Sequence, residues 1–331
     1  MSLPSVALAS QATPVESLAR LASTLGPGSP KLFIKRDDLL SFAMGGNKVR
    51  KMQMVAAEAV AAGADSLITC GALQSNHARV TAAAGSALGL KVALVLNGAP
   101  PASATGNLLL DRTFGAEIRY VSTREERAPA MEQMAAEFRA EGRRPFVVPL
   151  GASNTTGALG MARALAEIAS SGIKPDAIVH STSSGGTQAG LIAGCALFGV
   201  RARIIGISAD DPAGHMRDVV NALLAGVAAR LGAAPGTIGA DRAVEVDDRF
   251  VGDGYGIPTA ASAEALDLLA RREGILLDPV YTSKAMAGLL SRIRAGEFRA
   301  YETVLFWHTG GTPGLFADTF QLRIENLRIR N

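Results

Sequence analysis

A regular alternation of short apolar runs with longer, helix-patterned stretches constrains the fold of this chain more than any other feature of its 331 residues. Short apolar runs are typical of buried strands, and apolar residues three and four positions apart are typical of amphipathic helices. We expect strands at residues 32–35, 66–70, 91–96, 117–121, 145–148, 177–181, 203–208, 243–246 and 303–307. We expect helices at residues 15–25, 47–62, 78–88, 107–114, 126–141, 157–170, 188–198, 215–231, 262–273 and 284–295. The alternation predicts a doubly wound α/β fold, arranged as two α/β layers with a cleft between them.

A glycine turn leads directly into a lysine near the start of the second helix. The stretch from Gly45 to Lys51 reads Gly-Gly-Asn-Lys-Val-Arg-Lys, and apolar residues at helical spacing follow it from Met52. A helix therefore begins near Asn47, and Lys48 lies where the turn becomes the helix. A desolvated lysine amine can form a Schiff base or act as a general base, although this one could also be an ordinary surface lysine.

The turn after the strand at 177–181 combines hydroxyl groups with glycines. Its residues are Ser183, Ser184, Gly185, Gly186 and Thr187, and a helix follows. Free amide donors and the positive end of a helix dipole make such a turn a good phosphate-binding site. The glycine and lysine spacing of a dinucleotide fingerprint or a P-loop is missing. A purely structural turn is the alternative.

Three further polar turns lie next to strands or helices, at residues 74–77, 278–282 and 307–311. Ligands in open α/β sheets bind at the carboxyl ends of strands, so these turns are candidates for the site. Each has a plain alternative, since Ser75 could be a helix cap, Tyr281 a half-buried aromatic and Thr309 a turn hydroxyl.

Composition limits the classes of function. The chain is 48% hydrophobic and 19% charged, with a net charge of +3, which gives no support for nucleic-acid binding. Cys70 and Cys195 lie in apolar stretches and are expected to be core residues in a reducing compartment. The four histidines are too far apart for metal-ligand spacing, so we expect no metal. No signal peptide or membrane span is predicted, and we expect a cytoplasmic protein.

Five motifs resemble those of one enzyme family in order and spacing. They are Gly45-Gly46-Asn47-Lys48, Gln74-Ser75-Asn76-His77, Ser184-Gly185-Gly186-Thr187, Gly254-Tyr255-Gly256 and Asp278-Pro279-Val280-Tyr281. Together they resemble the pyridoxal-phosphate enzymes grouped as 1-aminocyclopropane-1-carboxylate deaminase and D-cysteine desulfhydrase. The resemblance implies a tryptophan-synthase-β-like fold (fold type II), with two open twisted parallel sheets and helices on both faces. It also implies a homodimer, a large cofactor-binding domain at 1–50 and 158–331, and a small inserted domain at 51–157.

The resemblance further implies roles for single residues. Lys48 would hold pyridoxal 5'-phosphate as a Schiff base and remove the α-proton of a small amino-acid substrate. Catalytic roles are implied for Lys48, Ser75 and Tyr281. Cofactor contacts are implied for Asn47, Lys48, Asn76, Ser183, Ser184, Gly185, Gly186, Thr187 and Thr309. Substrate contacts are implied for Ser75, Asn76, His77, Tyr255, Tyr281 and Thr282.

Two departures from the deaminase pattern bear on the substrate. Thr282 stands where the deaminases have glutamate, and Thr309 stands where they have leucine. A hydroxyl facing the pyridine nitrogen suits elimination of a good β leaving group. We therefore expect β-elimination from D-cysteine, giving pyruvate, ammonia and hydrogen sulfide. L-Cysteate sulfo-lyase and 1-aminocyclopropane-1-carboxylate deaminase activities are the alternatives. Residues 41–44 and the tail at 317–331 match no motif.

Two interpretations that assign the chain to other classes of protein remain. A nucleotide-binding oxidoreductase would share the α/β pattern and the glycine turns, but the dinucleotide fingerprint is missing. A catalytically silent binding protein on the same fold is also conceivable, and the joint presence of Lys48, Ser75 and Tyr281 argues against it. The colour of the purified protein distinguishes both from a pyridoxal-phosphate enzyme.

Overall fold

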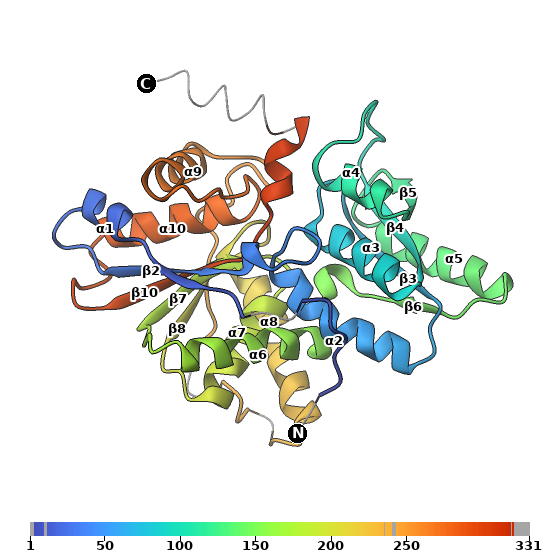
Figure 1. Ribbon diagram of the computed structural model, residues 1–331, viewed down its shortest axis with the longest axis horizontal. Helices are drawn as coiled ribbons and strands as arrows, with labels where there is room; N and C mark the ends of the chain where they lie inside the picture. The colour runs from blue at the N-terminus through green and yellow to red at the C-terminus, as the bar shows by residue number, and fades with distance from the viewer. Residues whose placement is uncertain (1–2, 10–11, 235, 240–242, 319, 321–331) are drawn as a thin grey trace.

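The computed structural model describes residues 3–9, 12–234, 236–239, 243–318 and 320, and these residues form two sheets (Figure 1). The strands are β1 (Val15–Ser17), β2 (Lys31–Arg36), β3 (Ser66–Ala72), β4 (Lys91–Asn97), β5 (Glu117–Val121), β6 (Pro145–Val147), β7 (Ala177–Thr182), β8 (Arg203–Ser208), β9 (Glu245–Asp247) and β10 (Thr303–His308). The α-helices are α1 (Ala19–Leu25), α2 (Asn47–Ala61), α3 (Asn76–Leu88), α4 (Gly106–Thr113), α5 (Arg127–Ala140), α6 (Thr155–Ser170), α7 (Gly186–Phe198), α8 (Ala213–Arg230), α9 (Ala260–Glu273) and α10 (Thr282–Arg294). The predicted α/β alternation is confirmed.

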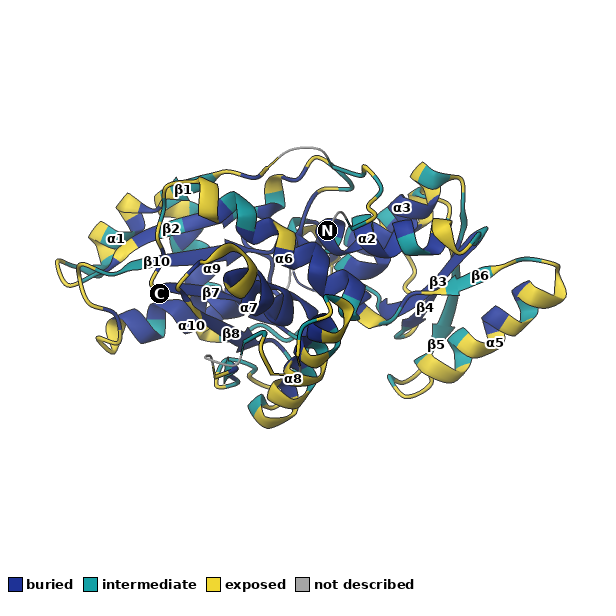
Figure 2. Ribbon diagram, turned by 90° about the horizontal axis from the view of Figure 1, so that it is seen from below, coloured by how far each residue is buried: buried dark blue, intermediate teal, exposed yellow. Residues whose placement is uncertain are grey.

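The larger sheet has the strand order β1-β2-β10-β7-β8-β9. Its strands run parallel except for β1, which pairs antiparallel with β2. Successive residues of a strand point to opposite faces, and β10 shows this clearly. Leu305 and Trp307 pack against α6, α7 and α8, whereas Val304 and Phe306 pack against α1, α9 and α10. Helices therefore cover both faces, and the central strands are buried (Figure 2).

The smaller sheet has the order β5-β4-β3-β6, and all its pairings are parallel. Leu67 and Leu94 face a core shared with α2, α3 and α4, while Ile68 and Val95 face α5. Helix α2 also contacts α6 beside the larger sheet, so it lies between the two parts of the molecule. The division into domains at residues 51 and 157 stays a prediction.

One predicted element is wrong in part. The expected helix at 15–25 is a short strand, β1, followed by the helix α1. Val15, Glu16 and Ser17 pair with Lys35, Ile34 and Phe33 of β2. A strand of three residues is too short to show an alternating pattern, and its pairing partner decides its conformation. The predicted strand at 243–246 is found as β9, and residues 240–242 lie outside the described residues.

A buried cluster of charged side chains anchors the start of α2. Arg50 donates hydrogen bonds from Nε and Nη2 to the carboxylate of Asp37, at 2.8 and 2.7 Å, and from Nη1 to Glu167 of α6 at 2.6 Å. Lys35 of β2 also pairs with Glu167, and the indole Nε1 of Trp307 donates to Asp37 at 2.8 Å. Burial alone would raise the pKa of Asp37, but Arg50, together with Trp307 and Lys35, outweighs burial and holds this pKa below its ordinary value.

Two backbone segments, one before α2 and one after β10, lie close together where α2 begins. The amide of Asn47 donates to the carbonyl of Thr309 at 3.0 Å, directly after β10. Gly46 has φ +103°, and a Cβ at this position would lie 2.8 Å from the same carbonyl oxygen. Only glycine fits here without displacing the chain. This contact and the ion cluster hold the first turn of α2 against the carboxyl end of the larger sheet.

The ion cluster makes a stability prediction. The substitution Arg50→Met leaves the fully buried Asp37 without its cation, so the free energy of unfolding should fall by about 3–5 kcal/mol. Urea unfolding followed by circular dichroism measures this loss. The control Arg271→Met removes an exposed ion pair with Asp267 and should change the free energy of unfolding by less than about 1 kcal/mol. Similar small losses in both variants would contradict the anchoring role.

Candidate active site

A cavity of about 210 Å³ opens at the carboxyl ends of β3, β7, β8 and β10, where ligands of open α/β sheets bind. Twelve residues singled out by the sequence line it: Asn47, Lys48, Ser75, Asn76, His77, Ser183, Ser184, Gly185, Thr187, Tyr255, Tyr281 and Thr309. They belong to loops and helix starts that are far apart in the chain and that lie next to both sheets. Gly186 and Thr282 do not line the cavity. The structure therefore brings together all but two of the predicted site residues.

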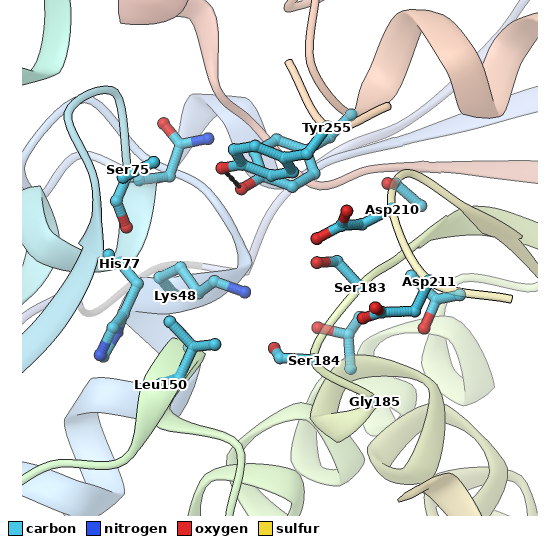
Figure 3. A pocket seen from close by; sticks show the side chains of 18 of the residues that line it. Lys48, Ser75, His77, Leu150, Ser183, Ser184, Gly185, Asp210, Asp211 and Tyr255 are labelled. Atoms are coloured by element: carbon cyan, nitrogen blue, oxygen red, sulfur yellow. Dashed lines mark hydrogen bonds between the residues drawn. The ribbon is translucent and has the colours of Figure 1, made fainter. Parts of the chain in front are cut away.

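The Lys48 side chain extends into the middle of the cavity. Figure 3 shows its amine directed toward the turn that carries Ser183 and Ser184, with Ser75 on the other side. Burial lowers the pKa of Lys48 to about 8. A much larger fraction of this amine is neutral near pH 7 than in an ordinary lysine, and the neutral amine is the nucleophilic form.

The glycine turn before α7 forms a pocket for an anion. Gly185 has φ +74°, and a Cβ on Gly186 would lie 2.7 Å from Ser153 Oγ and 2.8 Å from Lys51 Nζ. Both glycines therefore keep the backbone open at a helix N-terminus, where amide donors have no partner in the helix. Thr187 Oγ1 accepts a hydrogen bond from Asn47 Nδ2 at 2.7 Å, which leaves the hydroxyl proton for another acceptor.

Lys51 is a site residue that the motif reading passed over. Its Nζ donates to the carbonyl of Gly151 at 3.1 Å and to Ser153 Oγ at 2.9 Å, and Ser153 Oγ lies 2.7 Å from Ser184 Oγ. Burial, and then the charge of Lys48, lower the pKa of Lys51 well below its ordinary value. Lys51 follows Lys48 by three positions, a spacing that places both on one helix face, so the sequence did contain this signal.

The N-terminus of α3 forms the opposite wall. Ser75 caps this helix, and its Oγ accepts from the amide of Ala78 at 3.2 Å, so the capping alternative is confirmed while the side chain also reaches the cavity. His77 Nε2 lies 2.8 Å from Thr69 Oγ1. Burial lowers the pKa of His77 well below its ordinary value, and the imidazole is therefore neutral.

Two tyrosines close another side of the cavity. The hydroxyl groups of Tyr255 and Tyr281 are hydrogen-bonded, and their rings meet edge to face with centroids 5.7 Å apart. Burial raises the pKa of Tyr255 to about 12 and that of Tyr281 well above its ordinary value. Both phenols are therefore protonated at neutral pH, and the pair can donate one hydroxyl proton into the cavity.

An ion pair at the cavity joins loops from the two sheets. Arg124, after β5, donates two hydrogen bonds to Asp210, after β8, at 2.8 and 3.1 Å. Its guanidinium lies 5.1 Å from the centre of the Tyr255 ring. Both charged residues line the cavity, as do Arg127 and Asp211. The sequence offers no signal for this pair, since 86 positions separate its members.

Thr282 has a different place from the one predicted. Its Oγ1 donates to Asp278 Oδ1 at 2.7 Å, and its side chain is fully buried. The other oxygen of Asp278 accepts from the amides of Val280 and Tyr281, each at 2.9 Å. Thr282 therefore stabilises the loop that carries Tyr281, and its side chain does not line the cavity. Gly186 likewise shapes the anion pocket from behind the cavity wall.

The residues present fit pyridoxal phosphate. The cavity combines a partly neutral lysine amine, which suits an aldehyde, with a glycine turn backed by Lys51, which suits a phosphate, and Thr309 also lines it. Ser181 Oγ and Thr182 Oγ1 are buried there and have no hydrogen-bond partner among the described residues. Such hydroxyl groups are expected to be satisfied by a polar ligand. The described residues contain no cluster of three or more metal-ligating side chains and no helix able to cross a bilayer.

Known proteins resemble this chain over nearly its whole length. A D-cysteine desulfhydrase of Klebsiella pneumoniae is 40% identical over 322 residues, which cover 95% of this chain and 96% of the relative. A D-cysteine desulfhydrase of Yersinia enterocolitica is 39% identical over 322 residues, with the same coverage. The crystal structure of a homologue of 1-aminocyclopropane-1-carboxylate deaminase superposes with a TM-score of 0.90 at 37% identity, over 98% of this chain and 97% of that one.

More distant structures share the fold alone. A threonine deaminase from Solanum lycopersicum superposes with a TM-score of 0.67 at 16% identity, over 98% of this chain and 85% of that one. The fold is therefore that of the fold type II pyridoxal-phosphate enzymes, as predicted. Residues 6–310 match the family described as pyridoxal-phosphate dependent enzyme. This match, the two bacterial relatives and the fit of the cavity agree, and the chain belongs to the family of pyridoxal-phosphate dependent enzymes.

Proposed function

We propose that this enzyme eliminates the β substituent of D-cysteine and releases pyruvate, ammonia and hydrogen sulfide, with one water consumed. The observation that carries the proposal is a lysine amine with a lowered pKa that faces an anion pocket and a tyrosine pair in one cavity. Similarity to the two D-cysteine desulfhydrases supports this choice of substrate. The product set requires that the Cα–H and Cβ–S bonds break and that water then replaces the nitrogen on the α-carbon, which releases ammonia.

Pyridoxal phosphate, when bound, withdraws electrons from the α-carbon of an amino acid. The proposed cofactor contacts are Asn47, Lys48, Asn76, Ser183, Ser184, Gly185, Thr187 and Thr309, with Gly186 and Lys51 behind the phosphate. Lys48 is proposed to hold the cofactor and then to take the α-proton at its Nζ. Its low pKa suits this step, because a base works best with a pKa near the working pH.

The substrate carboxylate is proposed to bind at the N-terminus of α3. Ser75, Asn76 and His77 begin this helix, and its first amides and dipole favour an anion. His77 is neutral, so it adds a polar contact without a charge. The protonated Tyr281, hydrogen-bonded to Tyr255, is proposed to donate a proton to the departing sulfur. Thiolate is a good leaving group and requires no cationic pocket.

L-Cysteate is the second candidate because of one observation. Arg127 lines the cavity, and its Nε donates to the carbonyl of Arg124, whereas Arg124 itself is paired with Asp210. The remainder of the Arg127 guanidinium could hold a sulfonate. Ring opening of 1-aminocyclopropane-1-carboxylate is disfavoured by Thr309, which lines the cavity. Thr282 no longer supports that argument, because it lies outside the cavity.

The remaining expectations are also proposals. We propose a homodimer, a cytoplasmic location and a division into a large domain at 1–50 and 158–331 and a small domain at 51–157. The smaller sheet lies within the proposed small domain, and the six strands of the larger sheet lie outside it. Sedimentation velocity of the purified protein tests the oligomeric state.

Attachment of the cofactor to Lys48 makes the first prediction about function. The cofactor-free protein should turn yellow with pyridoxal phosphate, and borohydride should fix the cofactor on Lys48. The attachment rate should rise with pH only as far as about 8 and then level off, because the neutral amine reacts. The variant Lys48→Ala should show no fixed cofactor by mass spectrometry, while the control Lys91→Ala behaves as wild type. Fixed cofactor in Lys48→Ala would refute this assignment.

The phosphate pocket makes the second prediction. Thr187→Val removes a hydrogen bond to a charged group, worth about 1.5–3 kcal/mol, so cofactor affinity should fall about tenfold or more. Equilibrium titration of the cofactor-free protein measures this change. Thr81→Val, a buried threonine in α3 that lies outside the cavity lining, is the matched control. Unchanged affinity in folded Thr187→Val would place the phosphate elsewhere.

The substrate panel tests the reaction itself. The enzyme is incubated separately with D-cysteine, L-cysteine, L-cysteate and 1-aminocyclopropane-1-carboxylate, and sulfide, sulfite and keto acids are measured. Sulfide and pyruvate are expected with D-cysteine, and little 2-oxobutyrate is expected with the cyclopropane. Sulfite from L-cysteate alone would favour the second candidate. Fast formation of 2-oxobutyrate would overturn the argument from Thr309.

A further inference from the structure

A buried hydrogen-bond network centres on Arg79 in α3, one turn beyond the cavity wall. Its Nη1 donates to Asn76 Oδ1 at 3.0 Å and to Asn107 Oδ1 at 2.8 Å, and its Nη2 donates to the carbonyl of Gly45 at 2.9 Å. The three acceptors belong to the start of α3, the start of α4 and the glycine turn before Lys48. One fully buried guanidinium therefore joins three segments around the cavity.

The charge of Arg79 is unusual in its surroundings. Burial lowers its pKa to about 10, so the side chain is still a cation at neutral pH. Two acidic side chains lie near it, Asp111 in α4 and Asp278. Burial raises the pKa of Asp111 to about 8, and neither of its oxygens has a hydrogen-bond partner among the described residues. The three hydrogen-bond acceptors of Arg79 are neutral oxygens. A buried cation held in this way is weak evidence for stability alone, which favours a role in arranging its acceptors.

The network determines which way the amide of Asn76 faces. Asn76 Oδ1 accepts from Arg79 Nη1 and also from Asn107 Nδ2, each at 3.0 Å. These two bonds use both lone pairs of the amide oxygen. A reversed amide would place its NH2 group against two donors. The NH2 group is therefore the part of Asn76 left for the cavity that this residue lines.

Gln74, in the loop before α3, orients Asn107. The side-chain Nδ2 of Asn107 donates to the carbonyl of Gln74 at 2.9 Å, and the backbone amide of Asn107 donates to Gln74 Oε1 at 2.8 Å. Its Oδ1 faces Arg79, so Asn107 cannot reverse without losing hydrogen bonds on both sides. The orientation of Asn76 thus follows from a chain of fixed donors and acceptors.

We propose that Arg79 and Asn107 are positioning residues that hold Asn76 as a hydrogen-bond donor to an anionic ring oxygen of the bound cofactor. The inference rests on the proposed cofactor site. The ring oxygen and the aldehyde of pyridoxal phosphate are attached to neighbouring ring atoms. The residues that contact them, Asn76 and Lys48, must therefore be held at a fixed distance from each other. Arg79 does this, because the guanidinium that orients Asn76 also holds Gly45, three residues before Lys48.

The test uses the visible spectrum of the bound cofactor as a function of pH. A donor to an anionic oxygen stabilises the deprotonated form and keeps the spectroscopic pKa low. In Arg79→Met, Asn76 can turn, and this pKa should rise by about one unit, the shift that corresponds to one hydrogen bond to a charged group. Asn76→Ala should raise it similarly. The double variant should show no further rise, because Arg79 acts through Asn76.

A second route covers the case in which Arg79→Met does not fold. Asn107→Ala removes one donor to Asn76 Oδ1, and it should raise the spectroscopic pKa in the wild-type background and not in the Asn76→Ala background. Thr81→Val, a buried substitution in the same helix that leaves this network intact, should titrate as wild type.

The outcomes separate this inference from the proposed function. A wild-type protein that takes up no cofactor would remove both. A coloured wild type whose pKa is unchanged in Arg79→Met and Asn107→Ala overturns the positioning role alone. An upward shift that persists undiminished in the Asn76→Ala background also overturns it, since the effect would then not pass through Asn76.

Discussion

The buried pairing of Arg50 with Asp37 is the interaction on which the rest of the structure depends. Taking both charges out of water carries a penalty of several kcal/mol per ion, and only close hydrogen-bonded geometry offsets it. Here Glu167 and Trp307 complete that geometry. Because these residues come from the start of α2, the end of β2, α6 and β10, the arrangement fixes α2 against the larger sheet. Lys48, two residues before Arg50, is positioned as a result.

The electrostatic character of the cavity follows from this placement. Lys48 and Lys51 lie on one face of α2, Lys48 half-buried at the cavity and Lys51 fully buried behind it. Burial lowers the pKa of each, and for Lys51 the neighbouring charge adds to the effect. These two amines lie next to the N-terminus of α7. An anion bound there would stabilise the protonated form of both amines. Helix α2 thus carries Lys48 at the cavity and Lys51 behind the glycine turn that precedes α7, so one helix fixes the spacing of the two amines.

Sequence patterns predict the fold well and the site in part. Strand and helix periodicity is local, and the expected elements are found, apart from β1, whose conformation depends on pairing with β2. Motif residues such as Ser75 and Thr187 were identifiable because each lies in a turn with its own chemistry. Arg79, Arg124 and Asp210 were not, since their roles depend on contacts between segments that no periodicity connects. A motif also cannot show which way a side chain points, and the Thr282 side chain is directed to Asp278 and does not line the cavity.

The position of β10 has a consequence for how the molecule is made. The last strand lies between β2 and β7, so the larger sheet has no continuous centre until residues 303–308 have left the ribosome. The smaller sheet draws on residues 66–147 alone and can assemble while synthesis continues. Pairing across such sequence separations is slow, since loop closure precedes it. Thr309, whose carbonyl accepts a hydrogen bond from the amide of Asn47 at the start of α2, follows β10 and is therefore also made late. A chain that ends before residue 303 therefore lacks one wall of the cavity.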